Sequence, residues 1–126
     1  MIVGLGIDSV EIERFGHWHT YSQEKLGRFF SKKEIDYCLS SPEKSAERFA
    51  VRFAAKEAFF KALCQLYSEK NFKLLIVARN CQIVKTTYAP ELSVDWQVLK
   101  TPELRALISL THTRQTASAA VILQKL

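Results

Sequence analysis

Hydrophobic residues alternate with small or polar residues over the first ten positions of the chain. Positions 3, 5, 7 and 9 fall on one face of an extended segment, and Gly4, Gly6 and Asp8 fall on the other. Glycine weakens a strand and often marks the close approach of another backbone or of a ligand. The pattern therefore predicts a strand over residues 2–10, whose bare strip beside Asp8 either packs against a helix or faces a ligand.

The pattern changes to a helical period over residues 42–64. Ser41 supplies an N-cap and Pro42 a first helical residue. Apolar side chains then recur on one stripe of the helix: Ala46, Phe49, Ala50, Phe53, Ala54, Phe60 and Cys64. Glu57 falls inside this stripe, and a carboxylate on a buried face needs a partner. An i,i+4 pair with Lys61 would provide one, worth about 0.2–0.5 kcal/mol. Alternatively, Glu57 belongs to a functional site.

Shorter elements surround these two segments. Residues 11–21 form a basic, aromatic and helical segment, and Ser31 and Glu34 form a capping box that opens a short helix through residue 39. After residue 67 the pattern is typical of strands. The predicted strands cover residues 72–77, 82–87, 92–99, 107–113 and 117–123, and the last two form an antiparallel hairpin. The order of a strand, helices and strands predicts an α+β fold, in one domain over residues 1–126.

Composition and charge narrow the function. The chain has 126 residues and a net charge of +5, which favours a partner with negative charge: nucleic acid, an anionic membrane, an acidic protein or a phosphorylated small molecule. Three cysteines without metal-like spacing indicate reduced thiols in a cytoplasmic protein. No apolar run reaches the length of about 20 residues that spans a bilayer. The amino terminus lacks a basic leader, so we interpret it as a strand rather than a signal peptide.

Two further groups of residues are candidates for anion binding. Arg48, Arg52 and Lys56 recur every four residues on the long helix. Such a basic ridge is usually only a solvated face, but here it would bring several cations to one rigid element beside Glu57. Near the carboxyl end, hydroxyl groups surround His112, which is typical of a structural histidine but also suits a donor to phosphate.

Three segments, taken together and in this order, resemble bacterial holo-acyl carrier protein synthases, the small single-domain type of 4'-phosphopantetheinyl transferase. They are Gly4-Leu5-Gly6-Ile7-Asp8, Arg52-Phe53-Ala54-Ala55-Lys56-Glu57-Ala58-Phe59-Phe60-Lys61-Ala62-Leu63 and Ser109-Leu110-Thr111-His112-Thr113. The likeness is strong over residues 1–64, returns over 105–123 and is poor between, where residues 80–83 replace an expected Gly-Lys-Pro-like turn. It implies that the chain transfers the phosphopantetheine arm of coenzyme A to a serine of apo-acyl carrier protein and releases adenosine 3',5'-bisphosphate. It also implies a homotrimer with sites at the subunit interfaces.

The resemblance also implies roles for individual residues. Asp8 and Glu57 match the Mg²⁺ ligands, and Mg²⁺ usually takes one or two carboxylates plus substrate phosphate. Lys61 completes the catalytic set and would contact the pyrophosphate. The residues implied to bind coenzyme A are Arg52, Lys61, His112, Thr113 and Lys44. Acyl carrier proteins are strongly acidic, so a basic surface would guide their docking. The residues implied for that surface are Arg14, Trp18, Lys25 and Arg28.

Two other functions compete with this one. A small basic α+β domain that binds nucleic acid is compatible with the net charge and with the aromatic residues among the cations near residues 28–33. Against it, Asp8 and a half-buried Glu57 would repel phosphate unless a cation intervened, so we expect no nucleic-acid partner and no membrane partner. A scaffold that has lost activity and only binds acyl carrier protein is the third possibility, but Asp8, Glu57 and Lys61 are all present.

Overall fold

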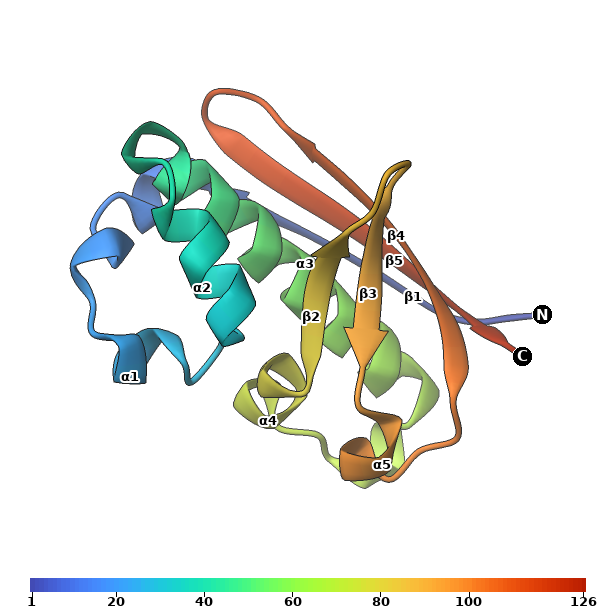
Figure 1. Ribbon diagram of the computed structural model, residues 1–126. Helices are drawn as coiled ribbons and strands as arrows, with labels where there is room; N and C mark the ends of the chain where they lie inside the picture. Colours follow the sequence, from blue (N-terminus) through green and yellow to red (C-terminus); the bar gives the residue numbers. More distant parts are fainter.

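The computed structural model describes residues 1–126, and its long helix α3 lies between two layers of other elements (Figure 1). On one side is an antiparallel sheet in the order β1-β5-β4. Its strands are β1 (Ile2–Glu11), β5 (Thr116–Lys125) and β4 (Leu104–His112). On the other side are a hairpin and shorter helices: β2 (Cys81–Lys85), β3 (Pro90–Val94), α2 (Lys32–Leu39) and α4 (Leu74–Arg79). This arrangement confirms the α+β fold.

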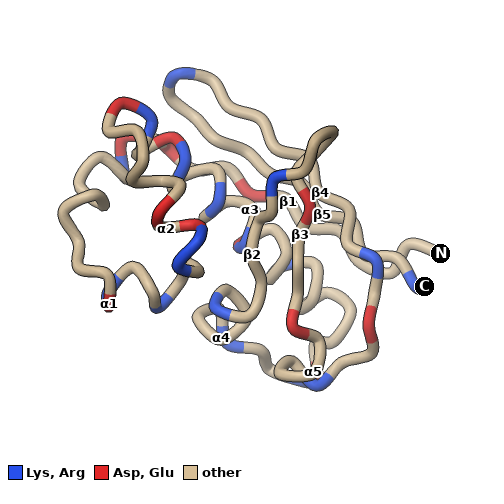
Figure 2. Tube along the Cα trace, viewed as in Figure 1, with Lys and Arg blue, Asp and Glu red and all other residues tan.

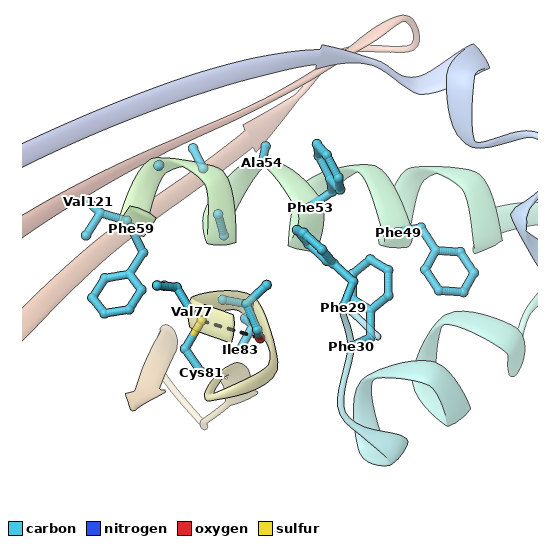
Figure 3. Close-up of a cluster of buried hydrophobic side chains, with 14 of the residues drawn as sticks. Phe29, Phe30, Phe49, Phe53, Ala54, Phe59, Val77, Cys81, Ile83 and Val121 are labelled. Carbon is cyan, nitrogen blue, oxygen red and sulfur yellow. Dashed lines mark hydrogen bonds between the residues drawn. The ribbon is translucent and has the colours of Figure 1, made fainter. Parts of the chain in front are cut away.

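Helix α3 (Ser45–Leu66) is buried on almost every side. Figure 3 shows how aromatic rings from the preceding segment pack against it, with Phe29 and Phe30 facing Phe49 and Phe53. Phe29 stacks on Phe53 with ring centroids 4.7 Å apart. Farther along the helix, Phe59 lies near Val77 and Val121 in the same view, so the core continues from the aromatic cluster to the sheet.

The bare strip of β1 packs directly on this helix. Gly4 and Gly6 are buried whereas Leu5 and Ile7 are exposed, as the alternation predicted. A Cβ atom at Gly6 would lie only 1.8 Å from the carbonyl oxygen of Ala58. The two backbones therefore approach more closely than any side chain permits. Asp8 lies two residues farther along the same face of β1, so this contact fixes the distance between Asp8 and α3.

Two predicted strands after residue 67 are wrong. Residues 72–77 do not form a strand, because residues 74–79 form the helix α4, whose Val77 and Ala78 are fully buried. The predicted strand 92–99 ends at Val94, where the carboxylate of Asp95 accepts a hydrogen bond from the Val98 amide and starts helix α5 (Trp96–Leu99). The turn between the first two strands of this region therefore lies at residues 86–89, not near residue 80.

The other boundaries agree with the predictions apart from two details. The N-terminal strand, the capping box of α2 and the closing hairpin are confirmed. The long helix begins at Ser45 instead of Pro42, because residues 42–44 form a 3-10 turn and Ser41 makes no side-chain cap. The segment 11–21 is not one helix. It forms two 3-10 turns, Ile12–Phe15 and Trp18–Thr20, which precede the short helix α1 (Gln23–Leu26). One more 3-10 turn, Ser68–Lys70, follows α3.

Substitution of Gly6 with alanine tests the contact between β1 and α3. We expect Gly6→Ala to lower the free energy of unfolding by about 2 kcal/mol or more, because the new methyl group overpacks a backbone that cannot yield. Chemical denaturation measures the change. Gly16→Ala is the matched control, since its Cβ would meet no atom closer than 3.3 Å. Equal stability of the two variants would contradict a tight contact at Gly6.

Candidate active site

Asp8 and Lys61 form an ion pair between β1 and α3. The Lys61 ammonium group donates to Oδ1 of Asp8 at 3.0 Å and to the Ile7 carbonyl oxygen at 3.0 Å. The Asp8 side chain is only 14% exposed, and its Oδ2 atom is buried without any hydrogen-bond partner. Of the two alternatives for Glu57, the i,i+4 pair with Lys61 is not formed, because Lys61 pairs with Asp8, 53 residues away in the sequence.

Glu57 lies half-buried on α3, within the electrostatic reach of Asp8. Burial raises the pKa of the Glu57 carboxyl above its usual range, and the negative charge of Asp8 raises it further. Lys61 and Arg14 act in the opposite direction and lower this pKa, but they do not offset burial and Asp8. Two acids, Asp8 and Glu57, thus lie near two cations, Arg14 and Lys61. The four residues come from β1, the 3-10 turn that follows it, and α3.

The two carboxylates fit a hard divalent cation. A buried carboxylate oxygen that lacks a donor, such as Oδ2 of Asp8, is costly unless a ligand satisfies it. Mg²⁺ binds oxygen atoms and usually takes one or two protein carboxylates. No group of three or more His, Cys, Asp and Glu side chains could hold a metal ion. The protein would therefore contribute Asp8 and Glu57, leaving other positions to water and substrate.

A basic cavity of about 370 Å³ opens between α2, α3 and the β2–β3 hairpin. Three residues predicted to bind coenzyme A, Lys44, Arg52 and His112, line this cavity. Arg52 is only 6% exposed, and its Nε atom has no hydrogen-bond partner. His112 is held by Glu47, with 2.9 Å between Nε2 and Oε1. The cavity therefore presents several cations to an anionic ligand.

The aromatic centre of this cavity is Tyr37, a residue that the sequence did not indicate as functional. The guanidinium groups of Arg48 and Arg52 lie 4.0 and 4.4 Å from the centre of the Tyr37 ring. The Lys85 ammonium group lies 2.5 Å from the phenolic oxygen, and this hydrogen bond lowers the pKa of Tyr37. Tyr37 of α2 thus contacts three cations, two from α3 and one from β2. Only the fold brings Lys85 to this place, and no sequence motif marks it.

Three residues predicted to dock a carrier protein line an apolar groove of about 280 Å³: Trp18, Lys25 and Arg28. Leu74 and Leu75 of α4 form its other wall. Trp18 also packs on Phe15, with ring centroids 4.5 Å apart, so it belongs partly to the core. The fourth predicted residue, Arg14, lies over the ring of Phe53, which lines the same groove, at 4.8 Å.

Two residues expected to bind an anion do not line the cavity. Of the basic ridge, Arg48 and Arg52 line the cavity, but Lys56 is completely buried and does not. Thr113 does not line the cavity. Its Oγ1 instead accepts hydrogen bonds from the amides of Gln115 and Thr116 in the β4–β5 turn.

Charged residues are distributed unevenly between the two layers. Figure 2 shows basic and acidic positions mainly on the helices and the segments that join them, whereas the three-stranded sheet carries few charges for its length. The cavity and the groove both lie on the charged side of the molecule.

None of the helices combines the length and the hydrophobicity that a membrane-spanning helix needs.

Comparison with known proteins gives consistent matches over nearly the whole chain. A family model described as the 4'-phosphopantetheinyl transferase superfamily matches residues 4–120. A holo-[acyl-carrier-protein] synthase of Treponema denticola is 41% identical, over 98% of this chain and 99% of the relative. The corresponding enzyme of Chlamydia muridarum is 38% identical, over 94% and 92%. The crystal structure of the Helicobacter pylori holo-[acyl-carrier-protein] synthase in complex with coenzyme A is similar, with a TM-score of 0.72, 26% identity and coverage of 95% and 99%.

The raised pKa of Glu57 predicts how its replacement changes stability with pH. A carboxyl whose pKa is higher in the folded state than in the unfolded state destabilises the fold once it ionises. Glu57→Gln should therefore be more stable than the wild type at pH 7, and the difference should vanish as the pH falls below the ordinary value of 4.5.

Urea denaturation at a series of pH values measures this difference. Glu91→Gln, at an exposed position of β3, is the control and should show no such trend. A Glu57→Gln variant that is less stable than the wild type at pH 7 would contradict the proposed burial of the charge.

Proposed function

Because the chain belongs to the 4'-phosphopantetheinyl transferase superfamily and is an enzyme of the holo-[acyl-carrier-protein] synthase type, we propose a specific reaction for it. The enzyme moves the 4'-phosphopantetheine arm from coenzyme A to a serine of apo-acyl carrier protein. The reaction depends on Mg²⁺ and releases adenosine 3',5'-bisphosphate. The observation that carries this proposal is the buried, unpartnered oxygen of Asp8 beside Glu57 and Lys61.

The proposed chemistry needs charge stabilisation at the pyrophosphate. Mg²⁺ held by Asp8 and Glu57 would neutralise negative charge on the pyrophosphate. Lys61 lies 3.0 Å from Asp8 and is half exposed, so its ammonium group can also donate to a phosphate oxygen. A cation fixed on a helix stabilises the charge that develops on the leaving phosphate.

The attacking serine hydroxyl must lose its proton. We propose Glu57, or a metal-bound water that it would orient, as the acceptor, because this carboxylate lies half-buried beside Asp8, where the reacting groups would meet. Arg14, which lowers the pKa of Glu57, also lies over the ring of Phe53, which lines the groove for the carrier. The acceptor serine would thus arrive from the groove side.

The basic cavity is the proposed site for the nucleotide end of coenzyme A. Lys44, Arg52 and His112 converge there, and the buried Nε of Arg52 lacks a partner that a phosphate oxygen would supply. Arg52 and Glu57 are five residues apart on one helix, about 7.5 Å along its axis. One rigid element would therefore hold the phosphates at both ends of the nucleotide in a fixed relation.

We propose that the carrier protein docks on the apolar groove. Lys25 and Arg28 line this groove, and Arg14 lies beside it, which suits a strongly acidic partner with an apolar contact surface. The alternative of a nucleic-acid-binding domain has less support, because the family is one of transferases and the cations surround a cavity instead of a flat stacking surface.

A homotrimer is the proposed assembly. The face of the sheet that points away from α3 carries exposed apolar side chains, among them Leu5, Ile7 and Leu107. A contiguous apolar face of this kind is typical of a subunit interface. Light scattering tests this proposal directly, since a trimer has three times the mass of the 14.4 kDa chain.

The decisive experiment combines the enzyme with coenzyme A, Mg²⁺ and apo-acyl carrier protein. We expect the intact mass of the carrier to increase by one phosphopantetheine arm, and only while Mg²⁺ is present. Asp8→Ala and Glu57→Gln should each slow transfer by about 100-fold or more, because each removes an oxygen ligand and several kcal/mol of transition-state stabilisation. Glu91→Gln is the control, and full activity in either site variant would refute the metal assignment.

Arg14→Ala tests the docking surface separately. We expect the KM for the carrier protein to rise about fivefold, since one exposed ion pair is worth about 1 kcal/mol, while the KM for coenzyme A stays unchanged. Arg79→Ala is the matched control, because Arg79 lines a different, polar cavity. An unchanged KM for the carrier would remove Arg14 from the docking surface.

A further inference from the structure

Lys56 precedes Glu57 in the sequence but points away from the active site into the protein. Its side chain is completely buried. The ammonium group donates to Oε1 of Glu34 at 2.7 Å, to the carbonyl oxygen of Phe29 at 2.8 Å and to the carbonyl oxygen of Ala78 at 2.9 Å. All three ammonium protons are therefore used within the protein.

Glu34 completes this network from helix α2. Its Oε1 atom also accepts from the Ser31 amide at 2.9 Å, and its Oε2 atom accepts from the Ile83 amide at 2.9 Å. The side chain of Glu34 is 1% exposed. Both carboxylate oxygens are thus satisfied without solvent.

The pair joins the parts of the molecule that form its two ligand surfaces. Phe29 lines the apolar groove, and Ile83 lines the basic cavity. Ala78 lies in α4, whose Leu74 and Leu75 form the far wall of the groove. Lys56 itself sits one turn beyond Arg52 and directly before Glu57 on α3. One ion pair therefore connects both surfaces to the helix that carries the catalytic groups.

A gain in folding stability does not by itself explain why Lys56 and Glu34 are buried as an ion pair. Removing two charges from water costs about as much as their attraction returns, so apolar side chains of similar volume often stabilise a fold equally well. What the pair provides in addition is a defined geometry, because its five hydrogen bonds can be made in only one arrangement of α2, α3, α4, β2 and the segment around Phe29.

We propose that Glu34 and Lys56 are positioning residues for phosphopantetheine transfer. They hold the groove for the carrier protein and the cavity for coenzyme A in register with Glu57. This inference rests on the proposed function, because it assigns the two surfaces to the two substrates.

Steady-state kinetics of Glu34→Asp and Glu34→Gln test the proposal. Aspartate keeps the charge but is one methylene too short to reach both Lys56 and Ile83. Glutamine keeps the length, but its NH₂ group would face one of the N–H groups that now donate to Glu34. We expect kcat/KM to fall about tenfold or more, with the KM for coenzyme A and the KM for the carrier both raised. Asp36→Asn is the matched control, since it breaks only the exposed Lys32–Asp36 pair on the same helix.

The division between KM and kcat separates positioning from mere stabilisation. A variant that only unfolds in part loses active enzyme, so its apparent kcat falls while both KM values stay at the wild-type level. That result would overturn the proposal, and so would the absence of a folded state, seen by circular dichroism, in both variants.

A failure of the proposed function would look different. The wild type would then transfer no arm to the carrier. In that case, calorimetric titration with coenzyme A still tests the positioning role. Weaker binding to folded Glu34→Asp than to the wild type supports it, and equal binding overturns it.

Discussion

The contact between the glycine strip of β1 and the backbone of α3 is the constraint on which the rest of the structure depends. Because Gly6 has no side chain, the backbone of β1 packs directly against the carbonyl of Ala58. The short distance between strand and helix lets Lys61 donate to both Asp8 and the Ile7 carbonyl. A strand held farther away would separate the two acids and leave Lys61 without partners on β1.

Helix α3 uses neighbouring charged residues for opposite purposes. Glu57 faces Asp8 with a raised pKa, whereas Lys56, one residue earlier, is neutralised inside the protein by Glu34. A full turn before Lys56, Arg52 is buried with one nitrogen left free for a ligand. Since successive residues of a helix point about 100° apart, one rigid rod can serve the core, the catalytic site and the nucleotide cavity at the same time.

Local sequence patterns predicted the helices and strands with a clear hydrophobic period or cap. They failed where the same pattern is compatible with a strand and with a helix. The alternation of β1 and the capping box of α2 were sufficient. The helical period also predicted α3, but its apolar stripe was drawn too narrowly, because Phe59 and Leu63 outside the stripe are fully buried whereas Phe60 is only partly so. The apolar run at residues 74–77 fits a buried strand or a buried helix equally well, because periodicity cannot separate them over so short a length. The run becomes helix α4 because its Val77 and Ala78 pack into the core beside α3, which is a tertiary effect.

The same distinction explains which parts of the site were predictable. Asp8, Glu57 and Lys61 lie in segments whose local form was predicted correctly, so the strand and the helix bring them near one another, although the pairing of Lys61 with Asp8 was not predicted. The spacing of Lys56 matches that of Arg48 and Arg52 and predicts a ridge of cations that could meet an anion, but the Lys56 ammonium group is buried in the protein instead. A buried lysine is rare unless it is paired, and its partner Glu34 is 22 residues away, already engaged as the acid of a capping box. A capping-box glutamate that is also buried therefore needs a cationic partner elsewhere in the chain. The candidate partner is a lysine or arginine on a helix whose neighbouring positions are apolar.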